Sequence, residues 1–394
     1  MNSKFGMFIH WGIYAQIGYH EQVLRIMEHD VYEKYAETFN PTEYDPEEWV
    51  LLAKRTGMKY ICITAKHHDG FCMWDTKFTD YKITNTPYGK DVLKMLADAC
   101  KKHGMLLSLY YSCPDWHYEY GYNPNSSHQW KAKNQDHPDT EKLRVYIKLQ
   151  IEELMSNYGP IYTLFWDIPP KIVDRSINEM VRKLQPHIYI NDRGFDEGDF
   201  STPEREFANL PNVRFAKATE ACNSVGENSW GYKKDETFYS ANVMCSNIHR
   251  IMAMGGSYLL NVGPDDRGVI TKEYVKKLEK IGNWYNRMEG CLEDNEPEPF
   301  DYEVQPIRGS INPHVVTRKN GKTYFHFYQG LISDHFRLKN WPSMPKSARL
   351  LNTGSMLDFA VTSRRMDEPE LLDIYHIPVD DTNGEPLVIE VEWS

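Results

Sequence analysis

The sequence contains no apolar segment long enough for the core of a signal peptide or for a membrane span. A cytoplasmic enzyme is therefore the default expectation, with a secreted or periplasmic protein that has lost its leader as the alternative. The chain also has no excess of basic residues, because 45 Lys and Arg stand against 56 Asp and Glu, for a net charge of -11. This balance favours neither nucleic acid nor an anionic membrane as a partner.

Cysteine and several motifs of cofactor enzymes are scarce or missing. The seven cysteines are odd in number, scattered, and never spaced as C-x-x-C, which favours buried free thiols over disulfides or a zinc site. No G-x-G-x-x-G or phosphate loop follows a strand-like segment, and His20-Glu21 lacks a second histidine four residues on. These absences weaken nucleotide binding and exclude an H-E-x-x-H zinc site, so no cofactor is expected.

The chain is rich in aromatic residues. They make up 13% of its 394 residues and include 10 Trp and 26 Tyr. With 41% hydrophobic and 26% charged residues, the composition is that of a soluble globular protein longer than one average domain. Many Trp and Tyr side chains suit a site that binds flat apolar faces, such as those of sugar rings.

The first three quarters of the chain alternate strand and helix patterns. Strands are predicted at 5–10, 60–65, 106–112, 162–166, 187–191, 213–219 and 257–262, and helices at 46–57, 92–103, 139–158, 240–253 and 272–289. Apolar strands alternating with helices indicate a parallel sheet covered on both faces. Seven or eight such units in about 290 residues favour a (β/α)8-like TIM barrel, regular or irregular, over an open sheet.

The pattern changes after Asp294. Prolines mark a linker, and residues 314–328 (HVVTRKNGKTYFHFY) place Asn320-Gly321 between two strand-like arms, a strong hairpin signal. Residues 387–393 alternate as a terminal strand. We therefore predict a barrel domain over residues 1–294 and an antiparallel β-sandwich domain over residues 295–394.

In a parallel barrel the functional groups gather at the carboxyl ends of the strands. The predicted ends are rich in histidine, carboxylate and aromatic residues: His10-Trp11, His67-His68-Asp69, Tyr110-Tyr111, Trp166-Asp167, Asn191-Asp192-Arg193 and Glu220. Two enzyme classes, metal-dependent hydrolases and glycosidases, use residues of these types.

Paired histidines with acids nearby can bind zinc or iron. Adjacent residues of a regular strand point to opposite faces, so His67 and His68 can both enter the barrel only where the chain has left the strand. Core histidines bonded to the backbone are the other reading of this pair. We assign no metal site.

A glycosidase needs two carboxyl groups beside the scissile bond, together with hydroxyl-binding groups and an apolar surface for the ring. Asp167 ends a buried strand beside Trp166, where a carboxyl is costly unless it is hydrogen-bonded or functional. A helix-cap or loop acid is the alternative for Asp167. Glu220 is expected to close the strand that includes 216–219, and Glu204 is a rival acid in a polar loop.

A resemblance to a known family rests on an ordered set of segments. These are Phe8-Ile9-His10-Trp11-Gly12, Lys66-His67-His68-Asp69-Gly70-Phe71, Trp74-Asp75-Thr76, Asn191-Asp192-Arg193, Ser229-Trp230-Gly231-Tyr232 and Leu259-Leu260-Asn261-Val262-Gly263-Pro264. Together they resemble the family 29 glycoside hydrolases, the retaining α-L-fucosidases, from the first residues to about Glu289. That family joins a (β/α) barrel to a C-terminal β-sandwich, in agreement with the pattern above.

The resemblance implies a role for each matching residue. Asp167 is implied as the catalytic nucleophile, and the positions that bind fucose hydroxyls or line its ring are His10, Glu21, His67, His68, Tyr110, Trp166 and Arg193. Trp230 is expected to cover the apolar face of the sugar, with plain core as the other reading. For the acid/base we favour Glu220, which matches a W-E segment before S-W-G-Y, over Glu204, which matches the loop glutamate of other members.

The implied function is exo-acting, retaining hydrolysis of terminal α-L-fucosyl linkages in oligosaccharides or glycoconjugates, through a covalent fucosyl-enzyme ester. A fucosylated substrate is the expected partner, and Trp393 on the terminal strand leaves a homo-oligomer open. Thr219 and Gln22 stand where the family usually has Trp. These departures keep a non-catalytic carbohydrate-binding barrel as an alternative, beside the metal-dependent hydrolase.

Overall fold

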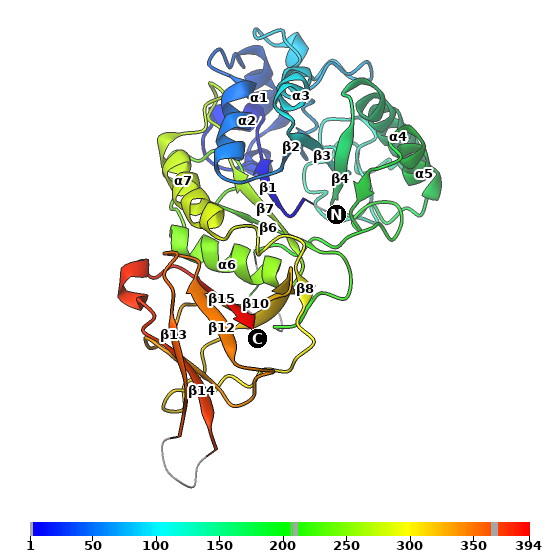
Figure 1. Ribbon diagram of the computed structural model, residues 1–394. Coiled ribbons are helices and arrows are strands. Elements are labelled where there is room, and N and C mark those ends of the chain that lie inside the picture. The colour runs from blue at the N-terminus through cyan, green and yellow to red at the C-terminus, as the bar shows by residue number, and fades with distance from the viewer. Residues whose placement is uncertain (1–2, 206, 208–211, 364–368) are drawn as a thin grey trace.

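A curled parallel sheet of seven strands forms the centre of the larger domain (Figure 1). The computed structural model describes residues 3–205, 207, 212–363 and 369–394. The strands lie in the order β5-β4-β3-β2-β1-β7-β6, and every neighbouring pair is parallel. Their bounds are β1 Phe5–Ile9, β2 Tyr60–Lys66, β3 Leu106–Ser112, β4 Ile161–Asp167, β5 Tyr189–Ile190, β6 Glu220–Ser224 and β7 Ser257–Val262.

Residues 200–204 fill the gap between the two edge strands, β5 and β6. Phe200 bridges Asn191 just after β5, and Glu204 bridges Cys222 of β6, both in parallel orientation. The amide of Arg205 donates to the carbonyl of Cys222 at 3.0 Å, which continues the pairing on the β6 side. This segment takes the place of a strand and closes the sheet into an irregular barrel. The predicted barrel is therefore confirmed.

Helices cover the outer face of the sheet. They are α1 His29–Tyr32, α2 Pro46–Arg55, α3 Val92–His103, α4 Thr140–Asn157, α5 Arg175–Leu184, α6 Ala241–Ala253 and α7 Lys272–Arg287. The side chain of Asp45 accepts hydrogen bonds from two first-turn amides of α2, and Gly104 ends α3 in the left-handed conformation with φ 65°. These caps satisfy backbone groups that a helix end leaves unpaired.

The predicted strand at 213–219 is wrong, because the strand begins only at Glu220. Glu220 pairs with Ser257, the first residue of β7, so β7 does not extend far enough to pair with residues 213–218. Of the seven predicted strand residues, Thr219 alone forms a bridge, to Ser201. Val213 is exposed, and the amide of Phe215 donates to the carbonyl of Met254 instead of joining the sheet.

The C-terminal part contains two antiparallel sheets. One has the order β12-β15-β10-β9-β8 and the other β11-β14-β13, and one apolar cluster joins residues of both. The bounds are β8 Glu296–Pro297, β9 Val315–Lys319, β10 Lys322–Phe327, β11 Phe336–Leu338, β12 Pro345–Leu350, β13 Asp358–Thr362, β14 Leu371–Tyr375 and β15 Leu387–Trp393. Asn320 and Gly321 turn β9 into β10 with φ of 51° and 79°, as a two-residue hairpin requires.

Helix α6 lies between the barrel and the C-terminal sheets (Figure 1). His249 of α6 and His326 of β10 are buried and joined by a 2.8 Å hydrogen bond between their ring nitrogens. Within the sandwich, Trp393 stacks on Tyr302 and donates to the Thr323 hydroxyl at 3.0 Å. Trp393 is therefore used within its own sandwich, and a homo-oligomer stays a prediction.

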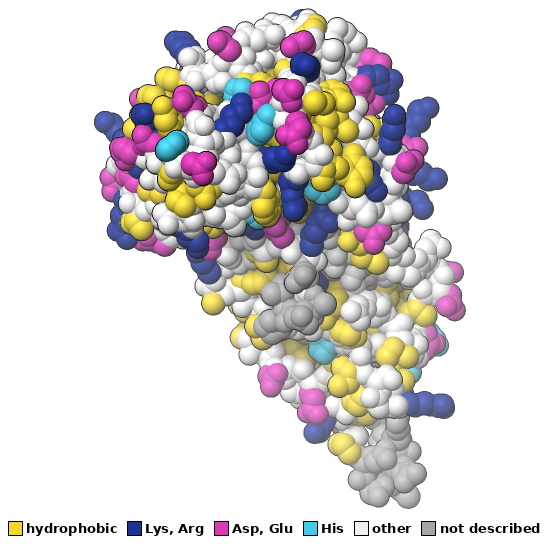
Figure 2. All heavy atoms as spheres, turned by 180° about the vertical axis from the view of Figure 1, so that it is seen from behind, with side chains coloured by type: hydrophobic (Ala, Val, Ile, Leu, Met, Phe, Trp, Pro, Cys, Tyr) yellow, Lys and Arg dark blue, Asp and Glu magenta, His cyan; other side chains and the backbone are white. Residues whose placement is uncertain are grey.

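All seven cysteines are free and buried, which confirms the predicted buried thiols. None of the helices in the described part of the chain is long and apolar enough to cross a membrane. Figure 2 shows acidic and basic side chains intermingled on one face of the barrel domain.

Candidate active site

A pocket of about 120 Å³ lies at the carboxyl ends of the strands. Its wall draws on β1, β3 and β4 and on the loops that follow β1, β2, β3, β4, β5 and β6. Most predicted site residues meet there: His10, Glu21, His67, His68, Tyr110, Asp167, Arg193, Glu204 and Trp230. Glu220 and Trp166 are not among the lining residues.

Strand alternation explains which side chains reach the pocket. Phe8, Tyr110 and Phe165 belong to one apolar cluster inside the barrel, whose buried side chains come from six of its strands. Residues two positions further along a strand share that direction, which brings His10 after Phe8 and Asp167 after Phe165 into the same space. The aromatic side chains inside the barrel and the polar side chains at its carboxyl end therefore follow from the same alternation of side chains along the strands.

A bulge at the end of β2 lets two adjacent histidines enter the pocket. The pairing of β2 with β3 shifts register between Thr64 and Lys66, and the strand ends at Lys66. His67 and His68 follow the strand and both line the pocket. The sequence allowed both histidines to enter the barrel only if the chain had already left the strand, and it has done so before His67. Bulges near active sites commonly redirect side chains in this way.

Asp167 is the last residue of β4 and its carboxylate is held by two donors. The Tyr110 hydroxyl donates to Oδ2 at 2.6 Å, and Arg193 Nη1 donates to Oδ1 at 3.0 Å. His68 Nε2 lies 3.8 Å from Oδ2. The next residue, Ile168, has φ 58°, a left-handed conformation that is strained for a β-branched side chain. This turn directs the chain away from the strand while Ile168 stays in the pocket wall.

Glu204 faces Asp167 across Arg193. Nη1 of Arg193 donates to Glu204 Oε1 at 2.7 Å and also to Asp167, so one cation contacts both carboxylates. The Glu204 side chain keeps 42% of its surface exposed, as expected at the mouth of the pocket. Desolvation raises the pKa of Glu204 and the charge of Asp167 adds to the shift, although Arg193 opposes it.

The hydrogen bonds of Ser112 determine which nitrogen of His68 carries the proton. The Ser112 hydroxyl donates to the carbonyl of Pro114 at 2.7 Å and lies 2.7 Å from His68 Nδ1. Its only hydrogen is used on the carbonyl, so Nδ1 must be the donor to Ser112. Burial lowers the pKa of His68 well below 6.5, which keeps the ring neutral. Nε2 of His68 is then a hydrogen-bond acceptor beside Asp167.

The same reasoning applies to His10. The amide nitrogen of Asn261 donates to the carbonyl of Trp230 at 2.7 Å, which leaves Asn261 Oδ1 to accept from His10 Nδ1 at 2.7 Å. Burial lowers the pKa of His10 to about 4, so Nε2 is unprotonated near neutral pH. His67, whose pKa burial also lowers, has a buried Nδ1 with no hydrogen-bond partner among the described residues. The three neutral rings suit sugar hydroxyls, which both donate and accept.

Glu21 connects two segments of the pocket wall. Its Oε2 accepts hydrogen bonds from the Ser229 hydroxyl at 2.8 Å and from the amides of Trp230 and Gly231 at 3.0 and 3.3 Å. These bonds hold Trp230 against His10, with ring centres 5.2 Å apart. Trp230 is thus part of the pocket wall and not only of the core.

The structure contradicts the preference for Glu220 as the acid. Glu220 begins β6 instead of ending a strand, so it lies at the opposite end of the barrel from Asp167. Its carboxyl is fully buried, where Oε2 accepts from the Tyr60 hydroxyl at 2.5 Å and Oε1 has no partner among the described residues. Tyr60 is itself the first residue of β2, which confirms that this is the amino-terminal edge.

We expect Glu220→Gln to stabilise the protein increasingly as the pH rises. Burial raises the pKa of Glu220 from 4.5 to about 7, so between these values the folded state binds more protons than the unfolded state. Wild-type stability therefore falls with rising pH in that window, by an amount on the order of 3 kcal/mol for this group. Glutamine cannot ionise and should escape the loss. Urea unfolding of both proteins at pH 5 and pH 8 measures the difference, and a pH-independent difference would contradict it.

The prediction that Trp166 lines the sugar ring is also wrong. It lies between the inward-facing Phe165 and Asp167 and therefore points to the helix side of the sheet. There its indole N–H donates to Asn178 at 3.0 Å and its ring packs against Gly194 and Phe195. Strand alternation, counted from Asp167, would have found this from the sequence.

Four lining residues were not singled out from the sequence: Phe8, His128, Phe165 and Ile168. Phe8 and Phe165 follow from alternation, because each precedes a predicted site residue by two positions. His128 lies in the long loop between β3 and α4, which has no periodic pattern, and nothing in the sequence marked it.

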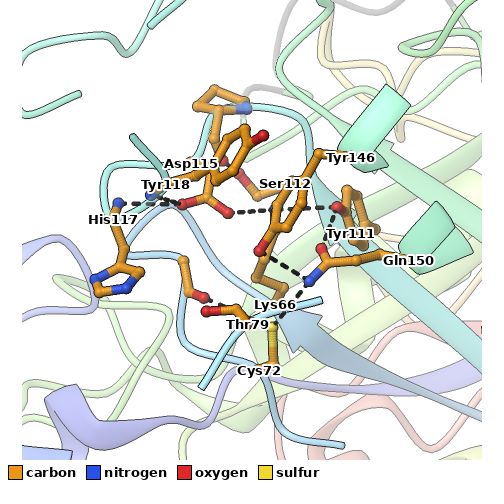
Figure 3. Close-up of polar contacts among 12 residues, drawn as sticks. Lys66, Cys72, Thr79, Tyr111, Ser112, Asp115, His117, Tyr118, Tyr146 and Gln150 are labelled. Atoms are coloured by element: carbon orange, nitrogen blue, oxygen red, sulfur yellow. Dashed lines mark hydrogen bonds and ion pairs between the residues drawn. The ribbon is translucent and has the colours of Figure 1, made fainter. Parts of the chain in front are cut away.

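A buried ion pair joins the last residue of β2 to the loop that follows β3 (Figure 3). Lys66 Nζ lies 2.7 Å from Asp115 Oδ2, with both side chains fully buried, and also donates to the Tyr111 hydroxyl at 3.0 Å. Burial alone would raise the pKa of Asp115, but Lys66 and backbone amides outweigh it and hold that pKa below its usual value. Breaking such a pair leaves an uncompensated buried charge, so the pair holds the loop after β3 against the end of β2.

Metal-ligating clusters were sought across the described residues. None of their groups of histidine, cysteine, aspartate and glutamate brings three or more side chains into an arrangement that could hold a metal ion. His10 and His68 instead have the hydrogen-bond partners described above.

Comparisons with known proteins agree with this geometry. A sequence model described as Alpha-L-fucosidase matches residues 1–289. The structure is similar to α-L-fucosidase isoenzyme 1 from Paenibacillus thiaminolyticus, with TM-score 0.86 and 30% identity over 100% of this chain and 97% of that one. It is similar to Thermotoga maritima α-fucosidase in complex with a mechanism-based inhibitor, with TM-score 0.80 and 26% identity over 99% and 95% of the two chains.

Curated relatives match at lower identity. Mouse tissue α-L-fucosidase is 22% identical over 100% of this chain and 89% of its own length. Rat tissue α-L-fucosidase is 26% identical over 72% of this chain and 66% of its own length, so that match spans slightly less than two thirds of the rat protein. Because the family model covers well over half of the sequence and includes every residue of the pocket, this chain belongs to the α-L-fucosidase family, glycoside hydrolase family 29.

Proposed function

We propose that this protein is an exo-acting, retaining α-L-fucosidase that cleaves terminal α-L-fucosyl linkages of oligosaccharides or glycoconjugates. Asp167 is the nucleophile and Glu204 is the acid/base. The barrel, residues 1–294, carries the chemistry, and residues 295–394 form the companion domain. The proposal rests on family membership and on one observation, the contact of Arg193 with both carboxylates.

This contact limits the distance between the two acids. Asp167 Oδ1 and Glu204 Oε1 lie 3.0 and 2.7 Å from the same nitrogen atom, so their separation cannot exceed the sum of these distances, about 5.7 Å. Retaining glycosidases place their carboxyl groups about 5–5.5 Å apart, whereas inverting enzymes need about 6.5–9.5 Å to admit a water. The upper limit of about 5.7 Å on the distance between the two carboxylates supports retention of configuration.

In the first step, a carboxylate oxygen of Asp167 forms a bond to the anomeric carbon. The bond from that carbon to the leaving oxygen breaks, its electron pair goes to the oxygen, and Glu204 donates the proton that neutralises it. In the second step, Glu204 takes a proton from water while the water oxygen displaces Asp167, which leaves as a carboxylate. Two inversions at one carbon give net retention.

The surroundings of the two acids suit these different tasks. The nucleophile must be ionised, and Asp167 receives hydrogen bonds from Tyr110 and from the Arg193 cation, both of which stabilise a carboxylate. The acid must hold a proton at working pH, and desolvation raises the pKa of Glu204. Hydrogen bonds that favour the carboxylate form of Asp167 and desolvation that favours the protonated form of Glu204 suit this division of roles.

The remaining pocket groups would bind one terminal sugar. His10, His67 and His68 offer neutral ring nitrogens to hydroxyl groups, and the aromatic side chains of Phe8, Phe165 and Trp230 offer apolar contact to a ring face and a methyl group. A small pocket at the end of the barrel, with room for one sugar unit, is consistent with cleavage at the end of a saccharide chain.

Hydrolysis of nitrophenyl α-L-fucoside, measured against a panel of other nitrophenyl glycosides, tests the proposal. We expect release of nitrophenol from the α-L-fucoside, and NMR should show α-L-fucose as the first product. Initial release of β-L-fucose would contradict retention, and turnover of only another glycoside would contradict the sugar. No turnover of any glycoside, with fucose still bound, would favour the non-catalytic alternative. Activity should survive prolonged chelation, and a loss that zinc reverses would favour the metal-dependent alternative.

A further inference from the structure

Trp130 is unlike every other tryptophan of the chain. Of the ten, it alone falls among the exposed large hydrophobic side chains, with 51% of its surface exposed. An exposed indole does not gain the free energy that a buried tryptophan contributes to folding. Its position next to the pocket indicates a use in binding.

The loop that carries Trp130 is held in place on two sides. Trp116 is fully buried, its amide donates to the His68 carbonyl at 2.8 Å, and its indole N–H donates to the His128 carbonyl at 2.7 Å. On the other side, Lys131 Nζ donates to the Met27 carbonyl at 2.7 Å. The exposure of Trp130 is therefore built into an anchored loop.

Trp130 continues the wall of the sugar pocket outward. His128 lines the pocket, with its ring centre 5.4 Å from that of His68 and 4.6 Å from that of Trp130. The three rings form a path from beside Asp167 to the surface. A group attached to a sugar in the pocket would leave the mouth along such a path.

Trp130 also has a polar neighbour with unused donors. The guanidinium of Arg25 lies 4.0 Å from the centre of the Trp130 ring. Its side chain makes no hydrogen bond or ion pair within the described part of the chain. An apolar aromatic surface beside free N–H donors matches a pyranose ring, which has C–H groups on its face and hydroxyl groups at its edge.

We propose that Trp130, Arg25 and His128 form a subsite for the leaving group, which binds the pyranose ring attached directly to fucose. The inference rests on the proposed function, because it assumes that fucose occupies the pocket. It specifies the substrate class as fucosylated saccharides, with a neutral pyranose next to the scissile bond.

The test compares substrates with and without that ring. α-L-Fucosyl fluoride has a single-atom leaving group, and fucosyl disaccharides of differing linkage supply the ring. For the best disaccharide, we expect the ratio of its kcat/KM to that of the fluoride to fall at least about tenfold in Trp130→Ala. Trp130→Leu keeps bulk without an aromatic face and should show the same fall. Trp341→Ala, a matched loss of a tryptophan in the C-terminal domain, should leave the ratio unchanged.

The outcomes separate this inference from the proposed function. If the wild-type protein does not hydrolyse fucosyl fluoride, the proposed function fails. If it does, a ratio within twofold of wild type in both Trp130 variants overturns the subsite. Hydrolysis of the fluoride without hydrolysis of any disaccharide also overturns it.

Discussion

Asp167→Gly is expected to lower kcat for nitrophenyl α-L-fucoside by about 10⁴-fold or more, without unfolding the protein. Glycine removes the oxygen that would bond to the anomeric carbon, and the other two carboxylates of the described pocket lining, Glu21 and Glu204, are held by Ser229 and Arg193. Tyr110 and Arg193, which donate to Asp167, would then be free to hold a small anion. Steady-state kinetics with circular dichroism as a check of folding measure the effect.

Added azide makes this result specific to a nucleophile. Azide that occupies the space of Asp167 attacks the anomeric carbon once, so Asp167→Gly should produce β-L-fucosyl azide. Asp98→Asn, an exposed acid on α3 paired with Lys94, is the matched control and should keep wild-type activity. Activity of Asp167→Gly within tenfold of wild type would show that another group is the nucleophile.

Glu204→Gln is expected to lower kcat for a fucosyl disaccharide by about 10²- to 10⁴-fold. An unactivated sugar leaves slowly unless its oxygen is protonated, and glutamine has no proton to give. A dinitrophenyl fucoside, whose leaving group needs no acid, should lose much less in the first step. With Glu204→Ala and this activated substrate, azide should replace water in the second step and yield α-L-fucosyl azide. The opposite anomers expected from the two variants distinguish the two roles.

Glu220→Gln is the control for this experiment. Glu220 is fully buried at the amino-terminal edge of the barrel and does not line the pocket, so its loss should leave kcat within a few-fold of wild type. The result expected from the sequence alone is the reverse. A large loss of activity with azide rescue in the Glu220 variant, and neither in Glu204, would restore the original assignment.

The difference between these two glutamates shows what a sequence pattern can miss. Glu220 follows an alternating segment that has the pattern of a strand, but β7 begins only at Ser257 and offers no partner upstream. Glu204 follows a polar segment with little strand character, yet its backbone pairs with β6 and closes the barrel. Strand pairing over long sequence separations decided both, and local propensity does not contain that information.

Trp166 and His128 differ in whether the sequence alone could place them. The direction of Trp166 follows from strand alternation once Asp167 is taken as inward, so the sequence contained the answer. His128 reaches the pocket from an irregular loop held by Trp116 and the Lys66–Asp115 pair, contacts that no periodic pattern encodes. Loops are positioned by tertiary contacts of this kind, and their residues are the least predictable part of a site.

The sequence by itself determined the alternation of strands and helices, the N-G hairpin of the C-terminal domain, the family, and most residues of the pocket. These features depend on local periodicity and on the order of motifs along the chain. The tertiary structure alone decided which glutamate faces Asp167, how the barrel closes, which nitrogens of His10 and His68 carry protons, and where Trp130 lies. Each of these depends on the distance between groups far apart in sequence, and such distances exist only once the chain has folded.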